Sequence, residues 1–338
     1  MTKLPLKDMR IVTLQDGLGR IAMRNRIGNY FKGLSGRLSA SAIVLLSLSG
    51  AASADATSIT LGYGLAADFI PAFVAKEEGF FQKNGLDVTL TSFPNTSVIV
   101  PTIISGSVQI GASTPPNLVL AAQGGLDIVD ISGAARLTKS DPRTNLLTRA
   151  GFSVKTASDL SGKKVGVPGI NSILDMFFRK WLLNNGVALN KVIVVEAPFA
   201  RMGDLLKSGQ IDAAVAIEPL LGRIVGSGSA SPSVDFLSEV DPDVLGALWA
   251  STRAWADANP KTVLAFRQSL AQSLDLIKSD PEKARAIENK YLHFNGRTFP
   301  TFSLETKVED FTSVIKVATD LGLLTEKVDA KTLIWAPK

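Results

Sequence analysis

A repeated unit constrains the fold of this chain more than any other feature of its sequence. The string Ser105–Gly111 recurs later as Ser208–Ala214, and Leu61–Tyr63 corresponds to Val165–Val167. Each copy alternates short apolar runs, which are typical of strands, with segments of helical spacing. Both copies therefore predict the order strand, helix, strand, helix, strand. We expect an α/β fold of two similar lobes, each a mainly parallel sheet flanked by helices.

Helix ends and lobe boundaries follow from the same repeat. The predicted helices Pro71–Asn84 and Leu174–Asn185 each end at a glycine, which can adopt the left-handed conformation that terminates a helix. We expect two crossings between the lobes, near Leu146–Thr148 and near Leu248–Ser251. Residues 55–147 together with 249–338 then form lobe 1, and residues 148–248 form lobe 2.

Residues 1–54 carry the features of a secretion signal. Eight basic residues precede the apolar run Ala40–Leu48, and Ala52–Ala54 supplies an A-x-A cleavage motif. Met23 would begin a signal of ordinary length, and we take it as a hypothesis for the start of translation. The alternative is an amphipathic helix of the mature fold. We expect a periplasmic protein that carries no lipid, because no cysteine follows the apolar run.

The basic charge of the chain lies in this leader. Residues 1–54 hold eight of the 36 basic residues and two of the 31 acidic ones, which leaves 28 basic and 29 acidic residues in the rest. Nucleic-acid binding therefore has no electrostatic support. The chain has no cysteine and one histidine, which excludes disulfides, thiolate metal sites and multi-histidine metal sites. We expect no metal, no cofactor and no enzymatic activity.

One motif keeps an enzyme as an alternative. Gly62–Ala67 fits the G-x-G-x-x-A pattern that binds dinucleotides after a strand. The acidic residue that this site needs at the end of the second strand is missing, because Asp87 begins that strand and Phe93 follows its end. A tight strand-to-helix turn explains the glycines better. A dinucleotide-dependent oxidoreductase remains the lesser alternative.

Three turns that follow predicted strands are candidate ligand sites. They are Leu65–Asp68, Ser113–Asn117 and Gly169–Ser172. In open α/β sheets, ligands bind beyond the carboxyl ends of the strands, where helix N-termini favour anions. Ser113 and Thr114 on one lobe and Asn171 and Ser172 on the other could hold an oxyanion without an arginine. The alternative for each turn is helix capping, which needs no ligand.

Other side chains complete the predicted cleft. Tyr63, Phe69 and Phe199 could line an apolar side of the cleft. Glu218 could accept a hydrogen bond from a ligand amine or brace the hinge. Arg136 could assist binding if its loop folds over the cleft, but we interpret it as a solvated surface residue.

Several strings carry a family resemblance. They are Phe73–Val88, Ala112–Pro116, Asp159–Val167 and Ser208–Pro219. Together they resemble the nitrate/sulfonate/taurine-type solute-binding proteins of ABC importers, a family that also takes up thiamine-pyrimidine precursors. The resemblance implies a two-lobed periplasmic-binding-protein fold with two inter-lobe crossings. It also places Tyr63–Asp68, Ser113, Thr114, Asn171, Ser172 and Glu218 at the cleft. Ala134–Pro142 matches no sulfonate or nitrate member, which leaves the solute open.

The leading hypothesis is a soluble, monomeric receptor for a small, anionic solute of the sulfonate, nitrate or taurine kind. It would close over the solute and deliver it to an inner-membrane ABC permease. A periplasmic sensor of the same fold is the alternative. Fungal relatives that make a thiamine pyrimidine use histidine and cysteine, so that activity is not expected here.

Overall fold

The computed structural model describes residues 56–337 except 95–97, 141–142, 294–295 and 297. The predicted signal peptide, residues 1–54, lies outside the described residues. Among the residues that are described, no helix is long and apolar enough to span a membrane.

The first sheet has six strands in the order β11-β4-β10-β3-β1-β2. Its strands are β1 (Thr57–Gly64), β2 (Leu86–Phe93), β3 (Ile110–Ser113), β4 (Ile128–Thr138), β10 (Asp243–Thr252) and β11 (Thr301–Phe302). Strand β1 pairs in parallel with β2 and β3. Strand β10 lies antiparallel between β3 and β4.

The second sheet repeats this plan with five strands in the order β7-β6-β8-β5-β9. Its strands are β5 (Thr144–Arg149), β6 (Lys164–Val167), β7 (Ile193–Glu196), β8 (Ala213–Ile217) and β9 (Ala230–Val234). Strand β6 is parallel to β7 and β8, and β5 pairs antiparallel with β8. The predicted pair of α/β units is confirmed. Both sheets are mixed, because each joins three parallel strands to further strands that pair antiparallel.

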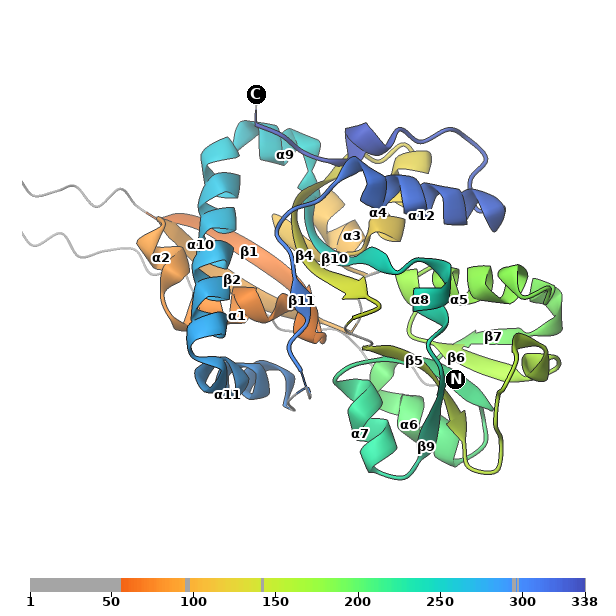
Figure 1. Cartoon of the computed structure of the whole chain (residues 1–338). Coiled ribbons are helices and arrows are strands. Elements are labelled where there is room, and N and C mark those ends of the chain that lie inside the picture. Colours follow the sequence, from red (N-terminus) through yellow and green to blue (C-terminus); the bar gives the residue numbers. More distant parts are fainter. Residues whose placement is uncertain (1–55, 95–97, 141–142, 294–295, 297, 338) are drawn as a thin grey trace, which may run out of the picture. The chain divides into compact units, whose positions relative to one another are not determined.

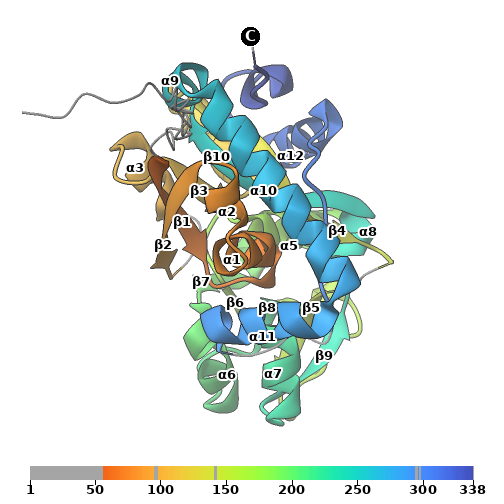
Figure 2. The same cartoon turned by 90° about the vertical axis from the view of Figure 1, so that its left-hand side faces the viewer.

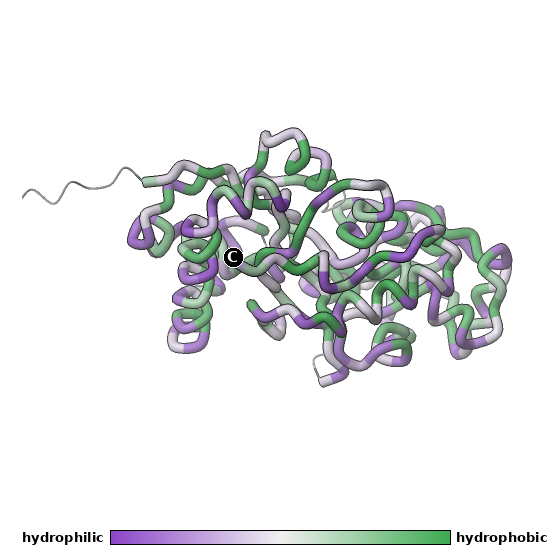
Figure 3. Tube along the Cα trace, turned by 90° about the horizontal axis from the view of Figure 1, so that it is seen from above, coloured by the Kyte–Doolittle hydropathy of each residue, from purple (hydrophilic) through white to green (hydrophobic). Residues whose placement is uncertain are grey.

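Helices flank both sheets. They are α1 (Ile70–Glu77), α2 (Phe80–Lys83), α3 (Ile99–Ile104), α4 (Pro115–Gln123), α5 (Ile173–Asn184), α6 (Phe199–Lys207), α7 (Leu220–Gly226), α8 (Phe236–Val240), α9 (Arg253–Ala258), α10 (Pro260–Ser279), α11 (Pro281–Leu292) and α12 (Val308–Asp320). Helix α10 packs against α1 and α2 beside the first sheet, and α6 and α7 lie with the second sheet (Figures 1 and 2). The peripheral helices carry both hydrophilic and hydrophobic residues, as expected of helices that cover a sheet with one face (Figure 3).

The first predicted helix is interrupted. The chain forms α1 and α2 instead of one helix over Pro71–Asn84, because Gly79 adopts a left-handed φ of 69° between them. Gly85 and Gly186 are left-handed, as predicted, with φ values of 78° and 74°.

The chain changes sheets earlier than the sequence suggested. Strand β5 pairs in the second sheet from Thr144 onward, and β10 pairs in the first sheet from Asp243 onward. The first connection therefore lies between Thr138 and Thr144, before the predicted crossing near residue 147. Helix α8 packs against α5, so the second connection follows it at residues 241–242, before the predicted crossing near residue 248.

Two residues of the first sheet, one aromatic and one acidic, are almost completely buried. Trp249 in β10 is 1% exposed and meets Phe69 and Phe266 edge-on, with ring centroids 5.0 and 5.5 Å away. Asp130 in β4 is also 1% exposed, and its Oδ1 accepts a hydrogen bond from the Ser132 amide at 2.9 Å. Burial raises the pKa of Asp130 to about 7, although this hydrogen bond and the charge of Arg267 act in the opposite direction.

Candidate ligand-binding site

A pocket of about 700 Å³, open solvent included, lies where the carboxyl ends of strands from the two sheets meet. Gly64 ends β1 and Thr114 follows β3 in the first sheet. Gly169 follows β6, and Ile217 ends β8 in the second sheet. This is the edge at which open α/β sheets bind ligands.

The pocket brings together five of the predicted site residues. They are Asp68, Phe69, Thr114, Ser172 and Phe199. The first three come from the turns after β1 and β3, whereas Ser172 and Phe199 come from the starts of α5 and α6. Both α/β units therefore contribute residues to one pocket.

The other predicted site residues lie outside this pocket's lining. The Tyr63 ring packs edge-on against Phe73, with centroids 4.8 Å apart. Ser113 is fully buried, and its Oγ accepts a hydrogen bond from Asn117 Nδ2 at 3.4 Å. Asn171 is left-handed with a φ of 60°.

Glu218 lines a neighbouring cavity of about 690 Å³, open solvent included, that shares Leu65 and Phe199 with the first. Its Oε2 accepts a hydrogen bond from the Gly222 amide at 3.0 Å.

Ser172 caps a helix. Its Oγ accepts a hydrogen bond from the Asp175 amide at 3.4 Å, so the capping alternative describes this side chain in the free protein. Asp175 is fully buried and binds Arg179 Nε at 2.7 Å and the Asn171 amide at 2.7 Å. Burial outweighs these two contacts and raises the pKa of Asp175. Polar contacts within the chain therefore hold the Gly169–Ser172 turn in place.

Thr114 differs from Ser172. It precedes α4, but its side chain does not cap that helix. The residue is 8% exposed, and within the described parts of the chain its Oγ1 has no hydrogen-bond partner. A buried hydroxyl without a partner costs about 1–3 kcal/mol. A hydroxyl in this state at a pocket wall is suited to a ligand that supplies the missing hydrogen bond.

The electrostatics of the pocket come from an ion pair that the sequence did not predict. Asp68 Oδ1 lies 3.1 Å from Arg143 Nη2, and the two side chains are 7% and 1% exposed. Asp68 lines the pocket, whereas Arg143 lies behind it. Among the described lining residues Asp68 is the one charged side chain, and the remaining walls are mainly apolar. The pocket surface is therefore not basic.

Arg136 is not the solvated residue that the sequence suggested. Its Nε lies 2.6 Å from Asp243 Oδ1, and its Nη2 lies 2.8 Å from Asp310 Oδ1. Burial opposes its charge, but the hydrogen bonds that its guanidinium donates to these two carboxylates outweigh burial and raise the pKa of Arg136. Both aspartates come from distant parts of the chain, which is why sequence spacing did not reveal them.

The sequence pattern of one family, described as NMT1/THI5-like, matches residues 66–284. The chain belongs to this family. A Brucella abortus relative described only as a binding protein is 28% identical over 248 residues, which cover 73% of this chain and 75% of that protein. The formylaminopyrimidine-binding protein of Halalkalibacterium halodurans is 24% identical over 63% of each chain. A yeast 4-amino-5-hydroxymethyl-2-methylpyrimidine phosphate synthase is 22% identical over 68% of each.

Solved structures of the same fold include periplasmic binding proteins. The aliphatic sulphonate binding protein SsuA from Escherichia coli has a TM-score of 0.69 at 17% identity, covering 82% of this chain and 97% of that one. The nitrate-binding protein NrtA from Synechocystis has a TM-score of 0.70 at 15% identity, covering 82% and 84%. The expected two-lobed periplasmic-binding-protein fold is confirmed.

Proposed function

We propose that this protein is the periplasmic solute-binding component of an ABC importer. It captures a small solute in the pocket between the two sheets, and closure of the lobes presents the loaded form to an inner-membrane permease. The observation that carries this proposal is the pocket itself, to which both sheets contribute and whose wall holds the unpartnered Thr114 hydroxyl. The predicted monomeric state and export belong to the same proposal.

The charges around the pocket support a different class of solute from the expected anion. The expected anion would meet the Asp68 carboxylate, and the described lining offers it no basic side chain. The apolar walls and the Thr114 hydroxyl favour a neutral, partly aromatic solute with hydrogen-bonding groups. A neutral aminopyrimidine has this chemistry, which is consistent with the name of the Halalkalibacterium relative. Sulfonates and nitrate are the competing solutes, since the starts of α4 and α5 meet at the pocket.

A binding screen tests both points. Purified protein is heated with 4-amino-5-hydroxymethyl-2-methylpyrimidine, MOPS, taurine or nitrate, and hits are measured by calorimetry. A solute at 100 times its dissociation constant should add about 2.7 kcal/mol to the free energy of unfolding. Stabilisation by the pyrimidine alone supports the neutral class. Stabilisation by MOPS or nitrate alone restores the anionic one.

The oxidoreductase alternative has little support at the turn after β1. A dinucleotide site needs a helix N-terminus there to hold the pyrophosphate. The chain instead forms a short 3₁₀ turn, Ala67–Phe69, in which Asp68 would repel phosphate. Stabilisation by NAD or NADP in the same screen would contradict this conclusion. A sensor is separated from a transporter by reconstituting solute uptake with the cognate permease and ATPase.

Replacing Thr114 by valine should have opposite effects on stability and binding. Binding should weaken about two- to tenfold, the cost of one lost hydrogen bond. The free protein should unfold at the same temperature or higher, because a buried unpartnered hydroxyl is removed. Calorimetric titration and thermal unfolding measure the two effects.

Thr148→Val is the matched control, because the hydroxyl of this buried β5 residue bonds to the Ser231 carbonyl instead. It should reduce stability and leave affinity unchanged. Adding Ser172→Ala to Thr114→Val should bring the loss of affinity to at least about tenfold. Unaltered affinity in that double variant would move the site elsewhere.

A further inference from the structure

A buried arginine joins the two halves of the fold beside the pocket. Arg143 immediately precedes β5, and its carbonyl accepts the Glu218 amide at 2.8 Å, so its main chain is bonded to the end of β8 in the second sheet. Its guanidinium binds groups of the first half instead. Nη2 lies 3.1 Å from Asp68 Oδ1 and 3.2 Å from the Arg136 carbonyl oxygen in β4.

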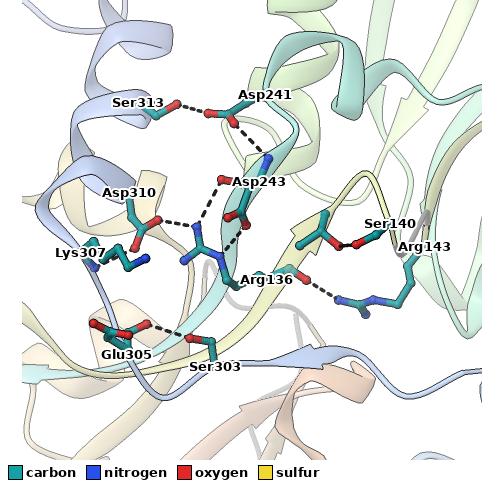
Figure 4. A network of polar contacts seen from close by, with 11 residues as sticks. Arg136, Ser140, Arg143, Asp241, Asp243, Ser303, Glu305, Lys307, Asp310 and Ser313 are labelled. Atoms are coloured by element: carbon teal, nitrogen blue, oxygen red, sulfur yellow. Dashed lines mark hydrogen bonds and ion pairs between the residues drawn. The ribbon is translucent and has the colours of Figure 1, made fainter.

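Further polar contacts link Arg136 to the second connection at residues 241–242. Arg136 binds Asp243 at the start of β10 and Asp310 in α12 (Figure 4). Ser313 of α12 donates to Asp241 Oδ2 at 2.6 Å, and Asp241 Oδ1 accepts the Asp243 amide (Figure 4).

The backbones of the two connections also touch. The Lys139 amide donates to the Pro242 carbonyl at 2.9 Å. One network of polar contacts therefore runs from the pocket wall to both connections and to α12.

We propose that Arg143 is a positioning residue that couples the pocket wall at Asp68 to the relative position of the two lobes. The inference rests on the proposed function, because it takes the pocket as the solute site. Arg143 moves with the second sheet through its main chain, whereas Asp68 belongs to the first half. Any rotation about the connections therefore either moves the Asp68 carboxylate or breaks the ion pair. Solute binding at Asp68 and the relative position of the lobes then depend on each other.

The residue type matters for this role. An arginine presents several donors in a fixed planar fork, so one guanidinium can hold a carboxylate and a carbonyl together. A lysine keeps the charge next to Asp68 but loses the fork. Arg143→Lys therefore separates charge neutralisation, which it retains, from positioning, which it removes.

The experiment uses the absence of cysteine in the chain. Ser105→Cys and Ser208→Cys place one spin label in each half, at equivalent exposed turns of the repeat. Distances between the labels are measured by pulsed electron resonance with and without saturating 4-amino-5-hydroxymethyl-2-methylpyrimidine, whose affinity is measured in parallel. Arg149→Lys is the control, because Arg149 pairs with Asp212 at the far end of β5, away from the pocket.

We expect Arg143→Lys to broaden or shift the distance distribution of the free protein and to weaken pyrimidine binding at least about fivefold. Arg149→Lys should leave both unchanged. If the lysine variant does not fold, Asp68→Asn/Arg143→Gln replaces it, since this pair leaves no buried charge. This double variant should unfold near the wild-type temperature, and its distance distribution should still differ from that of the wild type.

A folded variant at Arg143 with the wild-type distance distribution and, where the pyrimidine binds, the wild-type affinity would overturn the inference. The proposed solute class fails separately, when the wild-type protein does not bind the pyrimidine. The distributions of the free proteins still decide the role of Arg143 in that case.

Discussion

Replacing Trp249 by alanine should lower the free energy of unfolding by about 3–5 kcal/mol, the range for removing a large buried aromatic side chain. Trp249 is the largest fully buried residue described, and it lies on the central strand β10 of the first sheet. Its ring also supports Phe69, which lines the pocket. The cavity should therefore let Phe69 relax and weaken solute binding in addition to reducing stability.

Chemical denaturation and calorimetric titration measure the two effects. Trp255→Ala is the matched control, because this half-buried residue lies in α9 and does not line the pocket. It should cost less stability and leave affinity unchanged. Unaltered affinity in the Trp249→Ala variant would mean that its ring does not support Phe69.

A second large effect should appear as a dependence of stability on pH. Burial holds the pKa of Asp130 at about 7, above its ordinary value near 3.9. Between these values the folded state binds a proton that the unfolded state releases, so this residue's contribution to stability falls as pH rises from about 4 to 7. At higher pH its contribution is constant again.

Asp130→Asn should remove this dependence, because the amide is neutral at every pH. Relative to the wild type, the variant should gain about 2–3 kcal/mol between pH 5 and pH 8. Denaturant unfolding at several pH values measures the difference, in which the titration of other groups cancels. Asp87→Asn, at an exposed position of β2, should produce no such change. A difference that is flat with pH would place the pKa of Asp130 near its ordinary value.

The repeated unit was predictable because its strands and helices produce local sequence patterns. Short apolar runs, helical spacing and glycines at helix ends depend on neighbours in the sequence. These signals predicted the parallel strands of both sheets and placed Asp68, Thr114 and Ser172 at the edge where the pocket lies. The break at Gly79 was missed because the surrounding residues have continuous helical spacing.

The residues that give the pocket its charge were not predictable in this way. Asp68 and Arg143 are 75 positions apart, and Arg143 lies on the first connection, so their contact depends on where the chain changes sheets. Because the crossing was predicted near residue 147, Arg143 was not considered as a residue between the lobes. Tyr63 was selected by its position at the end of β1, but side chains alternate along a strand, and its ring faces α1 and α11.

The position of β10 has a consequence for how the chain folds. The second sheet is built from one continuous segment, 144–234, so all its strands are present once that segment has been made. The first sheet cannot join β3 to β4 until β10 arrives, after the whole second sheet has been synthesised. Long-range pairing of this kind slows folding. We expect the second half to fold first. The N-terminal strands of the first sheet can complete their pairing only after β10 has been synthesised.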